Sequence, residues 1–218
     1  MALTNVPSHT HEVVVDDALD FLDTLKYDYG RPVDLFESTA DALDWLHDHG
    51  LLHQPVEPSL QALRVPGAAA DRALARVRGV RDALREVIDA VVERRAPRPS
   101  ALAEVNRALT ARQRLVLVAG DGDLVLDHRH EGDPLDDVLA RVAERIARLA
   151  ASEDADRLRI CADDGCRWVF FDSSRTARRR WCDMSSCGNR AKAARHRIRA
   201  RGGSAGASVP PPSVAPPA

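Results

Sequence analysis

The chain has 218 residues, which allows one large domain or two smaller ones, and its hydrophobic fraction of 44% is sufficient for a buried core. The N-terminal residues contain neither a basic region nor an apolar stretch typical of a signal peptide, and no apolar run approaches the length of a transmembrane helix. These features exclude a signal-peptide-bearing or membrane-spanning chain, so we expect a cytoplasmic protein.

The formal net charge of −2 conceals an uneven distribution. Residues 157–201 carry 13 Arg or Lys against 4 Asp, a net charge of +9, whereas residues 1–156 have a net charge of −11. This division predicts two modules with different partners. The basic module should attract phosphates, and the acidic module should have another role.

The first predicted elements are short. Val13–Val15 fits a short strand, and apolar residues at helical spacing then predict a helix over Asp17–Lys26. The segment Tyr27–Pro32 contains Gly and Pro and predicts a turn. Thr39 fits the N-cap of a second helix over Ala40–His49.

A proline-containing connector, Gln54–Pro66, leads into the strongest helical pattern in the chain. Apolar residues recur every three or four positions over Ala69–Arg95 and predict one long helix, which Pro97 and Pro99 end. Ser100 fits the cap of a shorter helix that ends near Leu109.

The hydrophobic period then changes to two. Leu115–Ala119 and Leu124–His128 flank a Gly-Asp-Gly-Asp sequence, which predicts a β-hairpin. A helix that opens at Asp133 or Pro134 should follow and end near Ala150. Residues 13–156 are therefore expected to form an α+β domain that is mostly helical with a small antiparallel sheet. We expect residues 1–12 to be a flexible leader.

All four cysteines lie within 27 residues, as two close pairs: Cys161 with Cys166, and Cys182 with Cys187. Four thiolates that converge on one ion are typical of a structural zinc site, which is closed to water and substrate. Two disulfides would suit an oxidising compartment, which the expected cytoplasmic location does not provide. An iron–sulfur cluster or a redox role remains as an alternative. The sequence therefore predicts one structural Zn²⁺.

The cysteine pairs are embedded in a predicted zinc module over residues 157–201. Its opening, Arg157–Ile160, should be extended, and Gly165 is free to take a positive φ in the turn between the first two cysteines. Trp168–Phe171 and Arg178–Cys182 are predicted to pair as a hairpin.

A helix over Gly188–Arg199 should follow Cys187, which gives the layout of a treble-clef zinc finger. Trp168, Phe170 or Phe171, Trp181 and Ile198 are the expected small core, and the metal should supply most of the folding energy. The Gly/Ser/Pro segment 202–218 is expected to be disordered.

Basic residues dominate the predicted hairpin and helix of the zinc module, with one polar residue beside the last cysteine. Guanidinium groups bind phosphates with two hydrogen bonds and read guanine edges in a DNA major groove. Asn189 could contact a base, although we favour a role in bracing the start of the helix. The predicted nucleic-acid-binding residues are Arg175, Arg178, Arg179, Arg180, Asn189, Arg190, Lys192, Arg195, Arg197 and Arg199.

The string Cys182-Asp-Met-Ser-Ser-Cys187-Gly-Asn-Arg190-Ala-Lys192 resembles the signature of the CGNR zinc-finger family. Upstream, the stretch from Ala18 to Leu25, Trp45-Leu46 with Gly50-Leu51, and Leu84-Arg85-Glu86 resemble the ABATE domain of bacterial proteins described as stress-induced transcription regulators. That family usually has Asn-Thr where this chain has Asp23-Thr24. The resemblance implies a DNA-binding zinc finger joined to a domain that senses a ligand or dimerises.

Three classes of function follow. The first is a bacterial transcription regulator that binds DNA, with an N-terminal domain that senses a small-molecule effector or pairs two protomers as a homodimer. The second is a binding scaffold for RNA or protein, and the third is a thiol redox sensor that acts through the zinc site. The sequence contains no phosphate-binding loop, nucleophile elbow or His-Glu-x-x-His motif, so we do not expect an enzyme.

Overall fold

The computed structural model describes residues 15–52, 56–110, 113–119, 124–130 and 132–203, and over these ranges the fold is α+β. The α-helices are α1 (Val15–Leu22), α2 (Thr39–Asp48), α3 (Pro58–Ala62), α4 (Ala68–Glu93), α5 (Pro99–Leu109), α6 (Pro134–Ala150) and α7 (Asn189–Gly203). A 3₁₀-helix, η1 (Glu153–Arg157), and a π-helix, η2 (Met184–Gly188), complete the helical elements. Within the described ranges, no helix is both long and apolar enough to cross a membrane.

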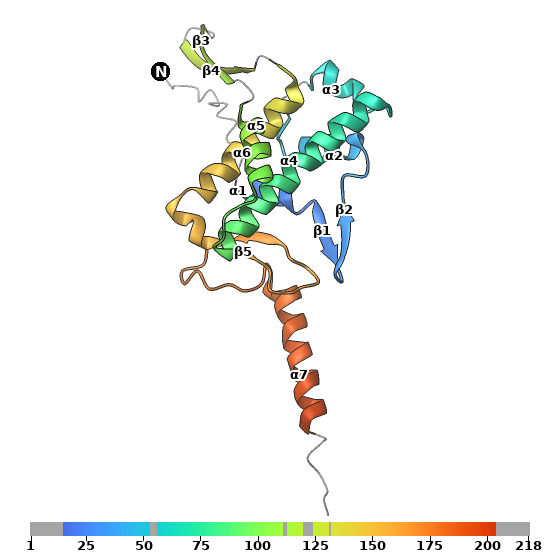
Figure 1. Cartoon of the computed structure of the whole chain (residues 1–218), viewed down its shortest axis with the longest axis vertical. Helices are drawn as coiled ribbons and strands as arrows, with labels where there is room; N and C mark the ends of the chain where they lie inside the picture. The colour runs from blue at the N-terminus through green and yellow to red at the C-terminus, as the bar shows by residue number, and fades with distance from the viewer. Residues whose placement is uncertain (1–14, 53–55, 111–112, 120–123, 131, 204–218) are drawn as a thin grey trace, which may run out of the picture.

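The strands form three separate antiparallel pairs within the described residues. They are β1 (Leu25–Asp28) with β2 (Arg31–Asp34), β3 (Gln113–Ala119) with β4 (Leu124–His130), and β5 (Leu158–Ile160) with β6 (Val169–Phe171). The expected α+β class with small antiparallel sheets is therefore confirmed. Figure 1 shows the β3–β4 hairpin and α7 at opposite ends of the molecule, with the other helices between them.

Helix α4 is the centre of the N-terminal core, as its long apolar pattern predicted. It packs against α1, α2, α5 and α6, and its buried face includes Val77, Leu84 and Ile88. Its last turn ends on Arg94, which adopts the left-handed conformation with φ 55°. The predicted helix over Ala69–Arg95 therefore agrees with the structure to within two residues at each end.

The N-terminus of α2 is stabilised by a capping box in which the cap differs from the prediction. Ser38, and not Thr39, is the N-cap: its hydroxyl accepts a hydrogen bond from Asp41 N, and the Asp41 carboxylate accepts one from Ser38 N. The hydroxyl of Thr39 instead donates to Ala70 O over 2.6 Å and ties α2 to α4. Because serine and threonine both serve as N-caps, the sequence does not show which of the two adjacent residues caps the helix. The packing of Thr39 against α4 leaves Ser38 as the cap.

The predicted helix over Asp17–Lys26 is too long. Helix α1 ends at Leu22, and the hydroxyl of Thr24 donates to Phe21 O over 2.8 Å where the chain leaves the helix. Leu25 then opens β1, which pairs with β2 through a turn at Tyr29 and Gly30, both with positive φ. Val15 belongs to α1, whereas the other two residues of the predicted first strand lie outside the described ranges.

Later elements follow the prediction more closely. The predicted hairpin is confirmed as β3 and β4, with Ala119 opposite Leu124, although its four-residue connection lies outside the described ranges. The side chain of Asp133 caps α6 by accepting from Leu135 N over 3.0 Å. Helix α3 was missed, because its five residues lie within a proline-containing segment that predicts a connector.

The zinc module shares its apolar core with the N-terminal helices. Strand β5 packs on α4 and β6 packs on α1, and Leu158 and Val169, each 1% exposed, belong to the main core. The partner of β6 is β5, so the predicted hairpin between Trp168–Phe171 and Arg178–Cys182 is wrong. Ile198 is 70% exposed on the projecting α7 and is not a core residue.

Arg81 is a buried charge at the centre of the N-terminal domain. Its side chain is 2% exposed, and its two terminal nitrogens donate to the two Asp34 carboxylate oxygens over 2.6 and 2.9 Å. Asp34 also accepts from Phe36 N over 3.0 Å, which places the Phe36 ring among Phe21 and Trp45. This pair therefore connects α4 to the β1–β2 hairpin and to the aromatic cluster.

Replacing Arg81 by Ala should lower the free energy of unfolding by about 1.5–3 kcal/mol, because the hydrogen bonds of its buried guanidinium to Asp34 are lost while Arg78 still faces that carboxylate. Arg72→Ala is the matched control, since Arg72 is exposed on the same helix, and its effect should stay within about 0.5 kcal/mol. Urea denaturation of both variants measures the difference. Equal midpoints would contradict a structural role for the buried pair.

Candidate metal centre and basic surface

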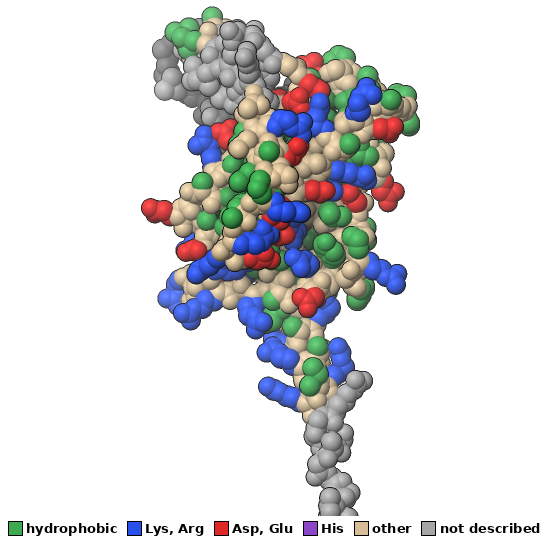
Figure 2. All heavy atoms as spheres, in the orientation of Figure 1, with side chains coloured by type: hydrophobic (Ala, Val, Ile, Leu, Met, Phe, Trp, Pro, Cys, Tyr) green, Lys and Arg blue, Asp and Glu red, His purple; other side chains and the backbone are tan. Residues whose placement is uncertain are grey.

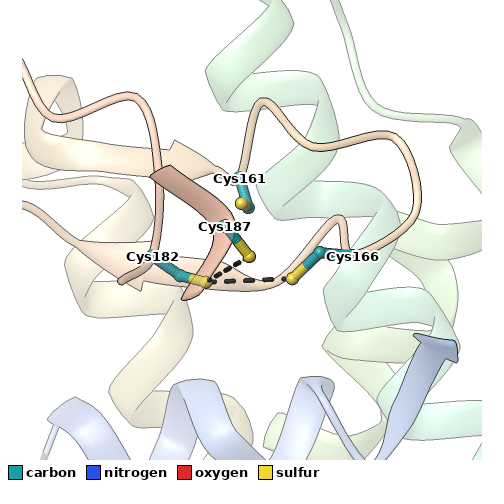
Figure 3. Close-up of side chains that lie close together, drawn as sticks. All are labelled: Cys161, Cys166, Cys182 and Cys187. Carbon is teal, nitrogen blue, oxygen red and sulfur yellow. Dashed lines mark hydrogen bonds between the residues drawn. The ribbon is translucent and has the colours of Figure 1, made fainter. Parts of the chain in front are cut away.

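The four cysteine sulfurs converge on one point (Figure 3). All four Sγ atoms lie within 4.8 Å of one another, and the Sγ of Cys182 is 3.8 Å from that of Cys166 and 3.7 Å from that of Cys187. A tetrahedron with zinc–sulfur bonds of about 2.3 Å has edges of about 3.8 Å. The cluster therefore fits one structural zinc ion in both its ligand chemistry and its size.

Local backbone structure places each cysteine. Cys161 follows β5, and its N–H donates to Trp168 O over 2.8 Å at the end of the β5–β6 ladder. Cys166 closes a tight turn in which its N–H donates to Asp163 O over 2.8 Å. Cys182 precedes η2 and Cys187 lies within it, so a π-helical turn brings the second pair together.

Burial and mutual repulsion disfavour the ionised thiolate forms of two of these cysteines. Burial, followed by the neighbouring Cys161 thiolate, raises the pKa of Cys166 to about 11. Burial and the Cys161 and Cys166 thiolates raise the pKa of Cys182 still further. A divalent cation offsets both effects, because it compensates the charge of the thiolates that bind it.

Asn189 and Arg190 both make hydrogen bonds inside the zinc module. Asn189 Nδ2 donates to Ser185 O over 2.9 Å, in line with the bracing role that we favoured. Arg190 Nη2 lies 2.9 Å from Cys187 Sγ, and Arg190 Nε donates to Asp163 Oδ2 over 2.9 Å. Arg190 therefore links the fourth cysteine to the turn that carries the second.

Asp163 is the carboxylate that accepts the hydrogen bond from Arg190. Although partial burial acts to raise it, hydrogen bonds from Arg190 and from Gly165 N–H hold the pKa of Asp163 below its ordinary value. Asp163 thus stays ionised and pairs with the Arg190 guanidinium. Hydrogen bonds of this kind around metal ligands commonly orient the ligands and support metal affinity.

Gly165 does not use the freedom of glycine to take a positive φ. In this turn Arg167 takes the left-handed conformation, with φ 55°, and the Gly165 N–H donates to Asp163 Oδ1. A Cβ on Gly165 would lie 3.3 Å from Asp163 Oδ1 and 3.5 Å from Tyr29 Cα. Glycine is therefore suited to this position by the close approach of the β1–β2 turn.

A buried carboxylate organises the loop that carries the arginines 175 to 180. Asp172, fully buried, accepts from Ser174 N over 3.0 Å and from Arg179 N over 2.7 Å. Sequence reasoning missed this role, although the Asp-x-Ser spacing after a strand is a signal for such a turn. Arg179 also donates to Cys182 O and lies over the Phe170 ring, and Arg180 lies over the Trp181 ring.

The predicted nucleic-acid-binding residues thus fall into two groups. Asn189, Arg190, Arg179 and Arg180 contact their own module. The side chains of the others make no hydrogen bond or ion pair with any residue that the structure describes, and they are Arg175, Arg178, Lys192, Arg195, Arg197 and Arg199. Figure 2 shows Lys and Arg side chains gathered on the zinc module and along α7.

Comparison with known families agrees with this arrangement. Residues 16–153 match the ABATE family model, described as "Putative stress-induced transcription regulator". The chain belongs to the ABATE family. Residues 157–200 of this ABATE protein match the CGNR zinc finger, so all four clustered cysteines lie within a recognised zinc-binding module. A search of curated proteins finds no match.

The ABATE domain also supplies contacts to the zinc module that sequence reasoning did not identify. Asp23 and Arg85 bind the backbone directly after Cys166, through Val169 N and Arg167 O. Both residues lie in stretches that resemble the ABATE domain, but the sequence does not predict their contact, because they lie 62 positions apart and meet only when α1 packs on α4.

Arg190→Ala should weaken zinc retention, because the variant loses the link between Cys187 and Asp163. We expect a loss of metal affinity of about 10–100-fold. Competition with a chromogenic zinc chelator measures it. Arg195→Ala is the control, because Arg195 lies on the same helix with a free side chain and should retain zinc like the wild type. Equal zinc affinity in the two variants would show that Arg190 does not support the metal site.

Proposed function

We propose that this chain is a bacterial, cytoplasmic transcription regulator whose zinc-folded C-terminal module binds duplex DNA. Cys161, Cys166, Cys182 and Cys187 hold the zinc ion. The unpaired cations of the loop and of α7 contact DNA phosphates, and the N-terminal ABATE domain responds to a small molecule or pairs two copies of the chain. The family description supports a regulatory role. The main structural support for DNA binding is the group of Arg and Lys side chains on the loop and α7 that have no partner among the described residues.

The basic surface suits a polyanion for a simple electrostatic reason. Most of the basic side chains in the N-terminal domain form ion pairs with acidic side chains, as Arg81 does with Asp34 and Arg95 with Glu86. The zinc module instead exposes cations that its own few aspartates leave free. Phosphate contacts release counterions and supply much of the affinity for nucleic acids.

Helix α7 has the shape of a DNA-contacting element. It is 15 residues long, projects from the body of the molecule in Figure 1 and carries no acidic residue. A helix of about 10–12 Å diameter fits a DNA major groove of about 12 Å width. Its start is fixed to the cysteine cluster through η2, so the metal site orients the whole helix.

The N-terminal domain has room for an effector. A groove of about 900 Å³ lies between α4 and α5, with Ala73, Gly79, Ala83 and Ala101 among its lining residues and Arg72 among the charged residues that border it. Its volume is within the range of small-molecule sites. The acidic character of residues 1–156 argues against a direct role of this domain on DNA, which supports sensing or pairing instead.

A salt titration of DNA binding tests the proposal. Changing Arg195, Arg197 and Arg199 together to Ala should reduce the magnitude of the slope of log K against log salt concentration by about 3, with at least about tenfold weaker binding at 100 mM salt. Fluorescence anisotropy with a labelled duplex measures both quantities.

The matched control changes three exposed arginines of the N-terminal domain, Arg72, Arg94 and Arg148, to Ala. This variant should bind like the wild type. Absence of duplex affinity in the wild type would overturn the proposal. Stronger binding to RNA of the same length and sequence would favour an RNA-binding role.

A further inference from the structure

One buried polar cluster joins the N-terminal domain to the zinc module. Asp23 lies just beyond the end of α1, and both of its carboxylate oxygens are 3.0 Å from Val169 N, which donates to them from the first residue of β6. Arg85 on α4 donates to Asp23 Oδ1 over 3.3 Å and to Arg167 O over 2.7 Å. The two side chains thus bind the backbone one and three residues after Cys166.

The cluster is short of positive charge. The charged groups that face Asp23 are Asp20 next to it along α1, and Arg85 and Asp89 on α4, whereas β6 presents only its backbone. Arg85 is shared, because its Nε donates to Asp89 Oδ1 over 2.8 Å. One guanidinium therefore serves two carboxylates in a place where the Asp23 side chain is only 2% exposed.

This environment favours the neutral form of Asp23. Burial, with smaller contributions from the Asp20 and Asp89 carboxylates, raises the pKa of Asp23 to about 8 against the opposing hydrogen bond from Val169 and the charge of Arg85. An ionised carboxylate loses most of its hydration at this site. A neutral carboxyl still accepts from Val169 N–H and does not carry that cost.

We propose that Asp23 is a pH-responsive positioning residue that holds the zinc module on the N-terminal domain. In its neutral form the carboxyl bonds β6 within the shared core. In its ionised form it gains by becoming hydrated, which favours release of β6 and of the turn that carries Cys166. The contact lies within the chain, so the proposal stands whether or not the module binds DNA.

The direction of the pH effect follows from linkage. The pKa of Asp23 in the packed state is about 8, above its ordinary value of 3.8, so the packed state binds the proton more tightly. Packing is then most favourable below the ordinary pKa, weakens as the pH rises, and becomes insensitive to pH above the raised pKa. Between these limits each pH unit changes the equilibrium by up to about tenfold.

Hydrogen exchange of the full-length, zinc-loaded protein tests this. The exchange of residues 167–171, corrected for the intrinsic pH dependence of amide exchange, gives the opening equilibrium of β6. Between pH 6 and pH 8 the wild type should open at least about tenfold more, as linkage requires. Asp23→Asn keeps an acceptor for Val169 N–H without a titrating group, so its opening should change less than about twofold.

Asp16→Asn is the control, because Asp16 is exposed on the same helix, and it should follow the wild type. The protection of α4 in each variant reports whether the N-terminal domain remains folded. Equal pH responses in the wild type and Asp23→Asn would overturn the proposal. Loss of β6 protection in Asp23→Asn at every pH, with α4 still protected, would also overturn it, since the site would then require the ionised carboxylate.

Discussion

The convergence of four thiols on one point is the constraint on which the zinc module of this protein depends. Two of the cysteines come from the β5–β6 region and two from the chain around η2, so one metal ion bound by all four would join these segments in addition to the hydrogen bonds between them. Burial raises the pKa values of Cys166 and Cys182, and a bound cation would favour their thiolate forms. Metal binding would in turn fix the start of α7, which begins at Asn189 directly after the π-helical turn that contains Cys187.

The metal does not hold the module alone. Leu158 and Val169 are buried in the main core, and the Asp23–Arg85 pair binds the backbone beside Cys166. The two family regions are therefore mechanically connected through α1 and α4. A change in the N-terminal domain that shifts either helix would reach the turn with Cys166 directly, which offers a physical route from the N-terminal domain to the basic helix α7.

Sequence reasoning succeeded where the signal is local. The cysteine spacing predicted the metal cluster, the change of period predicted β3 and β4, and the repeat of apolar residues predicted α4 and α6. It failed where tertiary packing decides. The strong β-propensity of Trp168–Phe171 predicts a strand but does not predict which strand pairs with it. In the structure that strand is β5, which also packs on α4. Asp23 is buried by segments that are far apart in sequence, and Ile198 is exposed because α7 projects away from the other elements. Local sequence patterns predict neither.

The most direct test of a zinc-dependent DNA-binding module is a metal-exchange experiment on the unmodified chain. Metal content and duplex affinity are measured on one preparation before chelation, after chelation and after the return of zinc. We expect one zinc per chain, loss of affinity with the metal and recovery when zinc is restored. Duplex binding that persists after the zinc is removed would contradict the view that the metal site organises the binding surface.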